Sequence, residues 1–174
     1  MSARPQQNEF APYFGQYINL VPDGSIIGLL TDHLSETVTL LGQLTEEQAD
    51  YRYAEGKWSI KEVLGHITDN ERIWSYRMLR IARGDQYNCV SYDENQFVAE
   101  AAFNLQPISS LIEEFTLVRR STILLLKGLK EEAWYRKGTL YDTKLTVNAA
   151  AYVIAGHEKH HRNILESRYG LGRS

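Results

Sequence analysis

Apolar residues recur at intervals of three and four positions through four separate stretches of the chain. These stretches are residues 23–44, 59–82, 109–129 and 146–168. The spacing predicts an amphipathic helix in each, because positions three and four apart lie on one face of an α-helix. The sequence shows no alternating strand pattern and no internal repeat. It therefore predicts an all-α protein, folded as an antiparallel four-helix bundle.

Local signals mark helix ends and the longest connection. Ser59 and Glu62 form a capping-box pattern, so the second helix is predicted to begin there. Residues 85–105 show no strong period, although Asp93 is placed to cap a short helix within them. Connections of this length in a bundle usually cross over it or carry function. Residues 134–144 have turn chemistry and predict a loop or a small hairpin.

The chain has a suitable length for one domain. With 174 residues, of which 43% are hydrophobic, it can bury a substantial core. We place a four-helix bundle domain at residues 23–170 and an N-terminal arm at residues 1–22. Four aromatic residues of the arm would be unfavourable in water, and these are Phe10, Tyr13, Phe14 and Tyr17. We expect the arm to pack across the bundle or against a second subunit, which is compatible with a homodimer.

Charge and composition argue against several classes of function. The formal net charge of −3 gives no bulk attraction to nucleic acid or to an anionic membrane. No run approaches the roughly 20 apolar residues of a membrane span, and the first residues do not resemble a signal peptide. Cys89 is the single cysteine, which rules out an internal disulfide. We therefore expect a soluble cytoplasmic protein with no nucleic-acid or membrane partner.

Three of the five histidines stand within five residues near the end of the sequence. On a helix, His157 and His161 project from one face and can share a metal ion, whereas His160 is rotated by about 100° from His161. A metal centre of the zinc type needs at least a third protein ligand. His66, on the border of the apolar stripe of the second helix, is the first candidate, and His33 on the first helix is its competitor. Three histidines leave one coordination position open, as in catalytic zinc sites.

Each part of this constellation also has a simpler interpretation. A lone histidine such as His66 is commonly a hydrogen-bonded packing residue. The five residues that begin at His157 fit the metalloprotease pattern His-Glu-x-x-His, but the third ligand of the extended motif is missing downstream. Glu158 is then either a surface carboxylate or an acid or base beside the site. Asp69, Asn70 and Glu158 are candidates for orienting imidazole N–H groups.

Two segments resemble a known family. Residues 51–72, which contain Trp58, the capping box and His66, are similar to the front half of the DinB-like (YfiT-like) metalloenzymes, and so are residues 81–85. Residues 154–165 resemble the last helix of that family, with the paired histidines at the expected interval. The resemblance extends over residues 24–169 and relates the chain to bacillithiol S-transferases.

The resemblance implies a fold and a metal site. It implies a four-helix bundle with up-down-down-up connectivity and a long crossover, for which residues 85–105 are available. It also implies one divalent metal ion, most often zinc or nickel, held by three histidines that correspond to His66, His157 and His161. Members and relatives include S-transferases that use bacillithiol and isomerases that use mycothiol.

The expected function is that of a metal-dependent enzyme. Lewis acidity would lower the pKa of a small thiol or a water molecule at the open position and create a nucleophile near neutral pH. The resemblance favours a low-molecular-weight thiol S-transferase, with a thiol as cofactor and a small-molecule electrophile as substrate. The alternatives are a metal-dependent hydrolase and a noncatalytic metal-binding protein of stress response or protein interaction.

Overall fold

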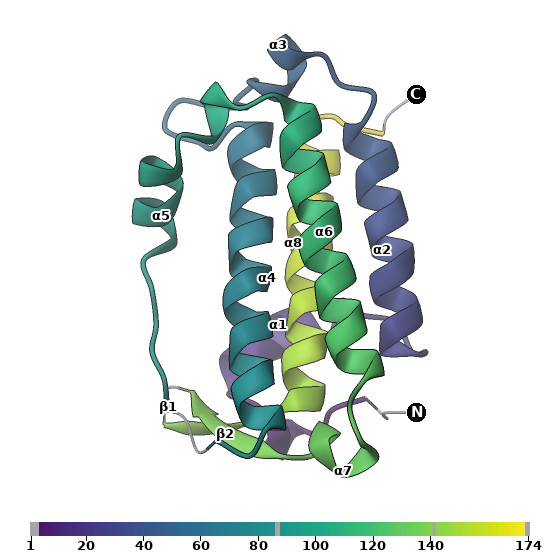
Figure 1. The fold of residues 1–174 in the computed structure, drawn as a ribbon. Helices are drawn as coiled ribbons and strands as arrows, with labels where there is room; N and C mark the ends of the chain where they lie inside the picture. The colour runs from purple at the N-terminus through teal and green to yellow at the C-terminus, as the bar shows by residue number, and fades with distance from the viewer. Residues whose placement is uncertain (1–3, 86–87, 141, 173–174) are drawn as a thin grey trace.

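Four long helices form the body of the molecule (Figure 1). The computed structural model describes residues 4–85, 88–140 and 142–172. The bundle helices are α2 (Ile26–Leu41), α4 (Ile60–Ala82), α6 (Ile108–Lys127) and α8 (Val147–Arg168). The predicted four-helix bundle is thereby confirmed. Among the described residues, no helix is both long and apolar enough to cross a membrane.

The order of helix directions departs from a simple antiparallel bundle. In Figure 1, α2 and α8 run upward, while α4 and α6 both run downward. Because α4 and α6 pack directly on each other and run in parallel, the chain must return along the bundle between them. The returning segment holds β1 (Asn88–Cys89), α5 (Glu94–Ala101) and η3 (Phe103–Leu105). The expected up-down-down-up connectivity and long crossover are confirmed, and the antiparallel arrangement predicted from periodicity alone is wrong for this pair.

A small sheet closes one end of the bundle (Figure 1). Strands β2 (Lys137–Leu140) and β3 (Thr143–Thr146) pair antiparallel, and β1 pairs in parallel with β2. The hairpin is one of the two forms that the turn chemistry predicted for this region. Strand β1 was not predicted, because its two residues are too few to show any alternation. A short helix, α7 (Glu131–Trp134), joins α6 to the hairpin.

Side-chain caps set the starts of the helices that carry the histidines. The Ser59 hydroxyl accepts from the backbone N–H of Glu62 at 3.1 Å, and the Glu62 carboxylate accepts from the backbone N–H of Ser59 at 2.7 Å. The predicted capping box therefore begins α4. Thr146 caps α8 by accepting from the backbone N–H of Ala149 at 3.0 Å, and Asp93 caps α5. A second capping box, at Thr45, begins the short helix α3 (Glu46–Ala49) between α2 and α4.

Helix α8 lies at the centre of the packing. Every residue from 147 to 158 is buried, including the run of alanines at 149–151. The hydrophobic core forms two clusters along the bundle axis, one toward the sheet and one toward α3. On each bundle helix, some buried polar residues stand between the residues of one cluster and those of the other, so a polar layer divides the core. They include Thr37 on α2, Glu71 on α4, Arg119 on α6 and Glu158 on α8.

The N-terminal segment packs across α8 of the same chain. It contains η1 (Gln7–Glu9), η2 (Pro12–Phe14) and α1 (Gly15–Ile18), and α1 lies directly against α8. Phe10, Phe14 and Ile18 are buried in the core. The approach is closest at Gly156, where an added Cβ would lie 2.1 Å from the carbonyl oxygen of Tyr17. The aromatic residues Phe10 and Phe14 thus find their partners within one chain.

Candidate metal centre

Helices α4 and α8 bring three histidines together in the polar layer. The Nε2 atom of His157 lies 3.1 Å from Nε2 of His66 and 3.2 Å from Nε2 of His161. One ligand atom from each of the three residues lies within 4.8 Å of the others. His66 and His157 are buried, and His161 is half-buried. The structure therefore assembles the three histidines that the resemblance implied, from positions 91 residues apart in the sequence.

The donor set fits a metal ion. Bonds of about 2.0–2.1 Å from a tetrahedral metal ion to imidazole nitrogens place those nitrogens roughly 3.3 Å apart. The two close Nε2 pairs, at 3.1 and 3.2 Å, have nearly this separation. A neutral imidazole carries only one N–H, so a ring that is protonated at Nδ1 has a lone pair on Nε2 for a metal ion. The arrangement is that of a candidate metal site with imidazole ligands.

Burial keeps these rings neutral, the form that binds metal. Removal from water lowers the pKa of His66 to about 4. The same effect holds the pKa of His157 well below its usual range, and the neighbouring His161, His66 and His160 lower it further. Burial likewise depresses the pKa of His161, with smaller contributions from His66 and His160. The site is therefore a cluster of bases whose protonation is unfavourable.

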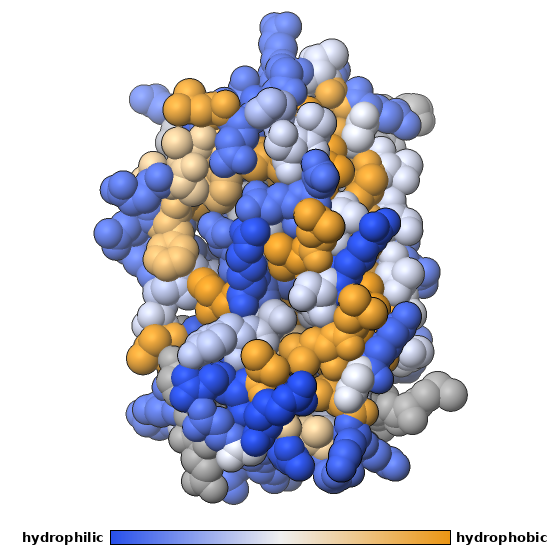
Figure 2. Space-filling view, in the orientation of Figure 1, coloured by the Kyte–Doolittle hydropathy of each residue, from blue (hydrophilic) through white to orange (hydrophobic). Residues whose placement is uncertain are grey.

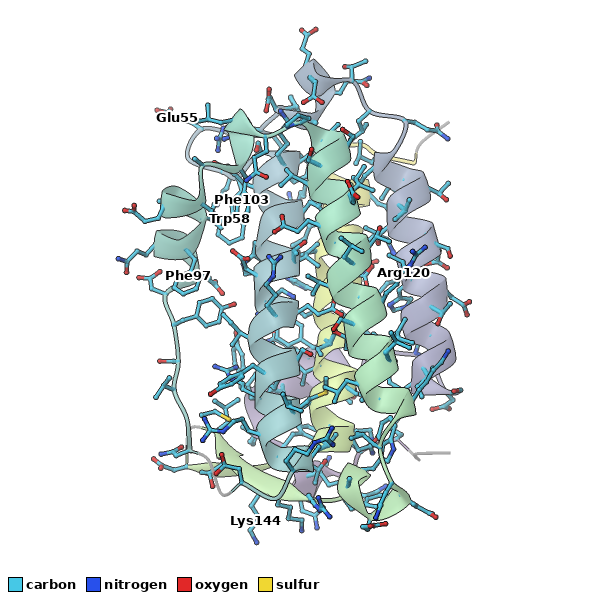
Figure 3. All side chains as sticks on the ribbon, viewed as in Figure 1. Glu55, Trp58, Phe97, Phe103, Arg120 and Lys144 are labelled. Atoms are coloured by element: carbon cyan, nitrogen blue, oxygen red, sulfur yellow. The ribbon has the colours of Figure 1, made fainter. Side chains whose placement is uncertain are left out.

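Aromatic side chains cover the centre on two sides. The Trp58 ring lies 4.8 Å from the His66 ring and stacks on the His161 ring at 6.5 Å, centroid to centroid. Tyr17 of α1 contacts both His157 and His160 edge to face, each at 5.5 Å. Trp58 lies on the side of α4 that faces the crossover (Figure 3). These rings restrict the motion of the imidazoles and shield them from water.

A recess on the surface reaches one of the three histidines, His161. It has a volume of about 220 Å³ and is lined by side chains that include Tyr53, Lys57, Trp58, Asn95, His161 and Tyr169. His161, the half-buried member of the three, forms part of its wall. A larger cavity of about 420 Å³ lies between α2 and α7, but its lining contains none of the three histidines. We therefore take the smaller recess as the approach to the centre.

Asp69 and Asn70 make contacts that lead away from the imidazole rings. Asp69 accepts a hydrogen bond from Arg72 at 3.2 Å, and burial raises the pKa of its carboxyl. Asn70 is buried one turn after His66, and its Nδ2 donates to the Tyr92 hydroxyl at 2.8 Å. That hydroxyl stays protonated near neutral pH, since burial raises the pKa of Tyr92. Asn70 thus connects α4 to the crossover beside the site, and the proposed role of both residues in orienting imidazoles stays a prediction.

Glu158 is deeply buried, so its interpretation as a surface carboxylate is wrong. It accepts a hydrogen bond from Thr37 at 2.6 Å and forms an ion pair with Arg119 at 2.7 Å. Arg119 is fully buried and donates to both oxygens of Glu71 at 2.8–3.0 Å and to the Leu30 carbonyl at 3.1 Å. We call Thr37, Glu71, Arg119 and Glu158 the buried ionic network.

The buried ionic network draws one residue from each bundle helix, and sequence reasoning did not find it. The sequence does indicate that Arg119 is buried, because it stands four residues after Phe115 and four before Ile123, within an apolar stripe. His33 belongs beside this network, with its Nδ1 3.7 Å from a carboxylate oxygen of Glu158. His33 is therefore not the third member of the histidine cluster, and His66 takes that place.

Comparisons with known proteins agree with this geometry. A model of the DinB superfamily matches residues 29–165. The Oceanobacillus iheyensis protein named "Putative metal-dependent hydrolase OB0413" is 27% identical over 134 residues, which cover 75% of this chain and 74% of that protein.

Two solved structures share the fold. YfiT from Bacillus subtilis, described as "a probable metal-dependent hydrolase with an unusual four-helix bundle topology", gives a TM-score of 0.68 at 18% identity. The alignment covers 95% of this chain and 93% of YfiT. A mycothiol-dependent maleylpyruvate isomerase gives a TM-score of 0.65 at 12% identity, covering 83% of this chain and 61% of the isomerase. At these identities the two structures establish the fold alone.

Proposed function

The chain belongs to the DinB superfamily, and from this membership we propose that it is a metal-dependent hydrolase of small molecules. The observation that carries the proposal is the convergence of His66, His157 and His161 at 3.1 and 3.2 Å between Nε2 atoms. The name of the Oceanobacillus iheyensis relative, "Putative metal-dependent hydrolase OB0413", supports hydrolysis over the thiol transfer expected from the sequence.

Each side chain around the centre has a part in this proposal. His66, His157 and His161 would hold a divalent ion, and burial keeps them in the neutral form that can do so. A bound zinc or nickel ion supplies Lewis acidity, the means by which hydrolases activate water near neutral pH. Trp58 and Tyr17 hold the imidazole rings in place and keep bulk water from them. The recess beside His161 admits the substrate.

Thiol transfer is the second candidate. The fold is shared with a mycothiol-dependent isomerase, and a centre of three imidazoles can serve a thiolate as well as water. A low-molecular-weight thiol would then act as cofactor and a small electrophile as substrate. The two reactions differ in whether they require a thiol, so assays with and without a thiol distinguish them.

Metal content and two assays test the proposal. The protein is purified without chelator, loaded with zinc or nickel and measured by elemental analysis, together with His157→Ala and the matched control His160→Ala. We expect about one ion per chain in the wild type and in His160→Ala, and loss of the ion in His157→Ala. Wild-type protein that cannot be loaded with either metal would overturn the proposal.

The loaded protein is then assayed with a panel of small esters and amides, and separately with a bimane electrophile and several thiols. Hydrolysis that requires the metal supports the first candidate. Thiol conjugation without hydrolysis would replace the first candidate with the second. Inactivity in both assays, with metal bound, would favour a noncatalytic metal-binding protein.

A further inference from the structure

The recess beside His161 shares a wall with the metal centre. Trp58 lines the recess and also contacts the rings of His66 and His161. A molecule in the recess would therefore lie against the same indole that covers the histidines. The recess is placed to hold the part of a substrate that does not react, while the reacting group reaches the centre.

Three large aromatic side chains, Tyr53, Trp58 and Tyr169, line the recess. The rings of Tyr53 and Tyr169 meet edge to face at 4.9 Å, and Trp58 stands beside them. The Tyr169 hydroxyl already donates to the Trp58 carbonyl at 2.6 Å, so its polar end is occupied and its ring remains for contact. Val63 and Ile164 add apolar surface. A flat apolar group suits such walls, since aromatic pairs prefer stacked or edge-to-face contact.

The size of the recess limits what fits. A cavity of roughly 150 Å³ lined by apolar side chains holds benzene. The recess has about 220 Å³, which leaves room for one ring and a small substituent. A fused or multi-ring ligand would extend into solvent.

The charge of the lining selects the substituent. Lys57 lies on the rim, and the lining contains no carboxylate. The Lys57 backbone is held by Arg52, whose guanidinium donates to the Lys57 carbonyl at 2.6 Å and pairs with Glu62. Glu55, in the same loop, lies at its outer edge, apart from Trp58 (Figure 3). The recess therefore attracts a negative substituent and disfavours a positive one.

We propose that the recess binds a single aromatic ring that carries a negatively charged group, with the ring against Trp58 and the charge near Lys57. This inference rests on the proposed function only in identifying the ligand as the substrate. The proposed function and this inference together assign small aromatic anions as the substrate class of the hydrolase.

Binding of probe compounds tests the inference without any assay of activity. Benzoate, benzyl alcohol and benzylamine are titrated into metal-free and zinc-loaded protein, and the indole N–H signals of Trp58, Trp74 and Trp134 are followed by NMR. A Trp58→Phe variant assigns the Trp58 signal. We expect benzoate to shift the Trp58 signal saturably and to leave the signal of Trp134, which lines the cavity between α2 and α7, unchanged. Benzylamine should bind more weakly than benzoate.

Three variants separate charge from shape. Lys57→Gln should weaken benzoate binding by about 5-fold and leave benzyl alcohol unaffected, the effect of an exposed ion pair. Lys159→Gln, on another face of α8, should change neither. Ile164→Trp should fill the recess and weaken the binding of all three probes. Circular dichroism shows whether this variant folds.

The results distinguish this inference from the proposed function. Absence of a saturable Trp58 shift with every probe, or benzylamine binding as tightly as benzoate, would overturn the inference whether or not the protein is a hydrolase. Benzoate binding that depends on Lys57 would uphold the recess as a binding site, even if the metal-loaded protein hydrolysed none of the esters and amides of the panel. That second result would count against the proposed function alone.

Discussion

Two buried polar clusters share α4 and α8, and they differ in how their hydrogen-bonding groups are satisfied. In the buried ionic network, Arg119 meets Glu71, Glu158 and a backbone carbonyl. In the histidine cluster, neutral imidazoles point nitrogen atoms at one another. In the first cluster, opposite charges meet within the protein, whereas the second brings together imidazole nitrogens that could hold a metal ion. Buried polar residues can therefore serve structure in one place and binding in another at the same level of a bundle.

The two clusters are mechanically connected through α8. His157 and Glu158 are adjacent, and successive residues on a helix differ by about 100° in direction. The contacts of Glu158 with α2 and α6 therefore fix the rotation of α8, and this rotation directs His157 toward α4. The structural cluster sets the geometry of the binding cluster.

Removal of the cation from the buried ionic network should produce the largest effect. Arg119→Met leaves Glu71 and Glu158 buried without their partner, and we expect the free energy of unfolding to fall by about 3–5 kcal/mol. Chemical denaturation measures this free energy of unfolding. Thr37→Val, which removes one hydrogen bond to Glu158, should lower the same quantity by only about 1 kcal/mol. A loss below about 1 kcal/mol in Arg119→Met would show that the network does not hold the bundle together.

The histidine cluster should be stabilised by metal only while all three of its imidazole rings are present. We expect zinc at 100 times its Kd to stabilise the wild type by about 2.7 kcal/mol and to leave the stability of His157→Ala unchanged. Thermal unfolding with and without zinc measures both, and His160→Ala should behave as the wild type. Equal stabilisation of His157→Ala and wild type would place zinc binding elsewhere.

A change at Gly156 should disturb the arm that covers the histidines and spare the buried ionic network. An alanine Cβ would lie 2.1 Å from the Tyr17 carbonyl oxygen, so the arm must move. We expect Gly156→Ala to lower the free energy of unfolding by about 1–3 kcal/mol, as overpacking does.

A second glycine provides the control for Gly156→Ala. Gly28→Ala in α2 meets only ordinary contacts and improves helix propensity, so it should be neutral or stabilising. If the two variants have the same free energy of unfolding in denaturant, packing of the arm does not depend on its close approach to α8.

The smallest expected effect is the pH dependence that His33 contributes. Burial lowers the pKa of His33 in the folded protein, with Glu158 and Glu36 opposing the shift and Arg162 and Arg119 adding to it. The unfolded chain then binds the proton more readily than the folded protein. The contribution of neutral His33 to the free energy of unfolding is therefore complete above about pH 6.5 and declines as pH falls.

Comparison with His33→Gln isolates this contribution from that of the other histidines. The metal-free wild type should lose more stability than the variant between about pH 7.5 and pH 5.5. Denaturation curves at the two pH values measure the difference. Parallel curves would mean that His33 does not titrate in this range.

Local chemistry explains what could be predicted of the fold. The capping box at Ser59 and the cap at Asp93 depend on neighbours within three residues, so they are readable from sequence and confirmed in the structure. The parallel pairing of β1 with β2 joins residues about 50 positions apart and leaves no local trace. The parallel direction of α4 and α6 was implied only by family resemblance, because amphipathic periodicity carries no information on helix direction.

The same distinction holds for the site. The spacing of His157 and His161 within one helix was sufficient to pair them, while His66 needed the resemblance to exclude His33. The ionic pairing of Arg119 with Glu71 spans 48 residues and two helices, and a single sequence does not show which charges meet. Surface hydropathy gives little further guidance, since hydrophobic and hydrophilic residues are interspersed over the face in Figure 2.

The complete burial of residues 147–158 bears on how the molecule is made. Helix α8 follows the other bundle helices in the chain, so it is the last of them to leave the ribosome. Until then the faces of α2 and α4 that pack on α8 lack this partner, and the N-terminal arm has no α8 to contact. We expect the nascent chain to stay unfolded and accessible to chaperones until α8 has been synthesised. The folding of the whole domain and the assembly of its histidines would then be a single late event.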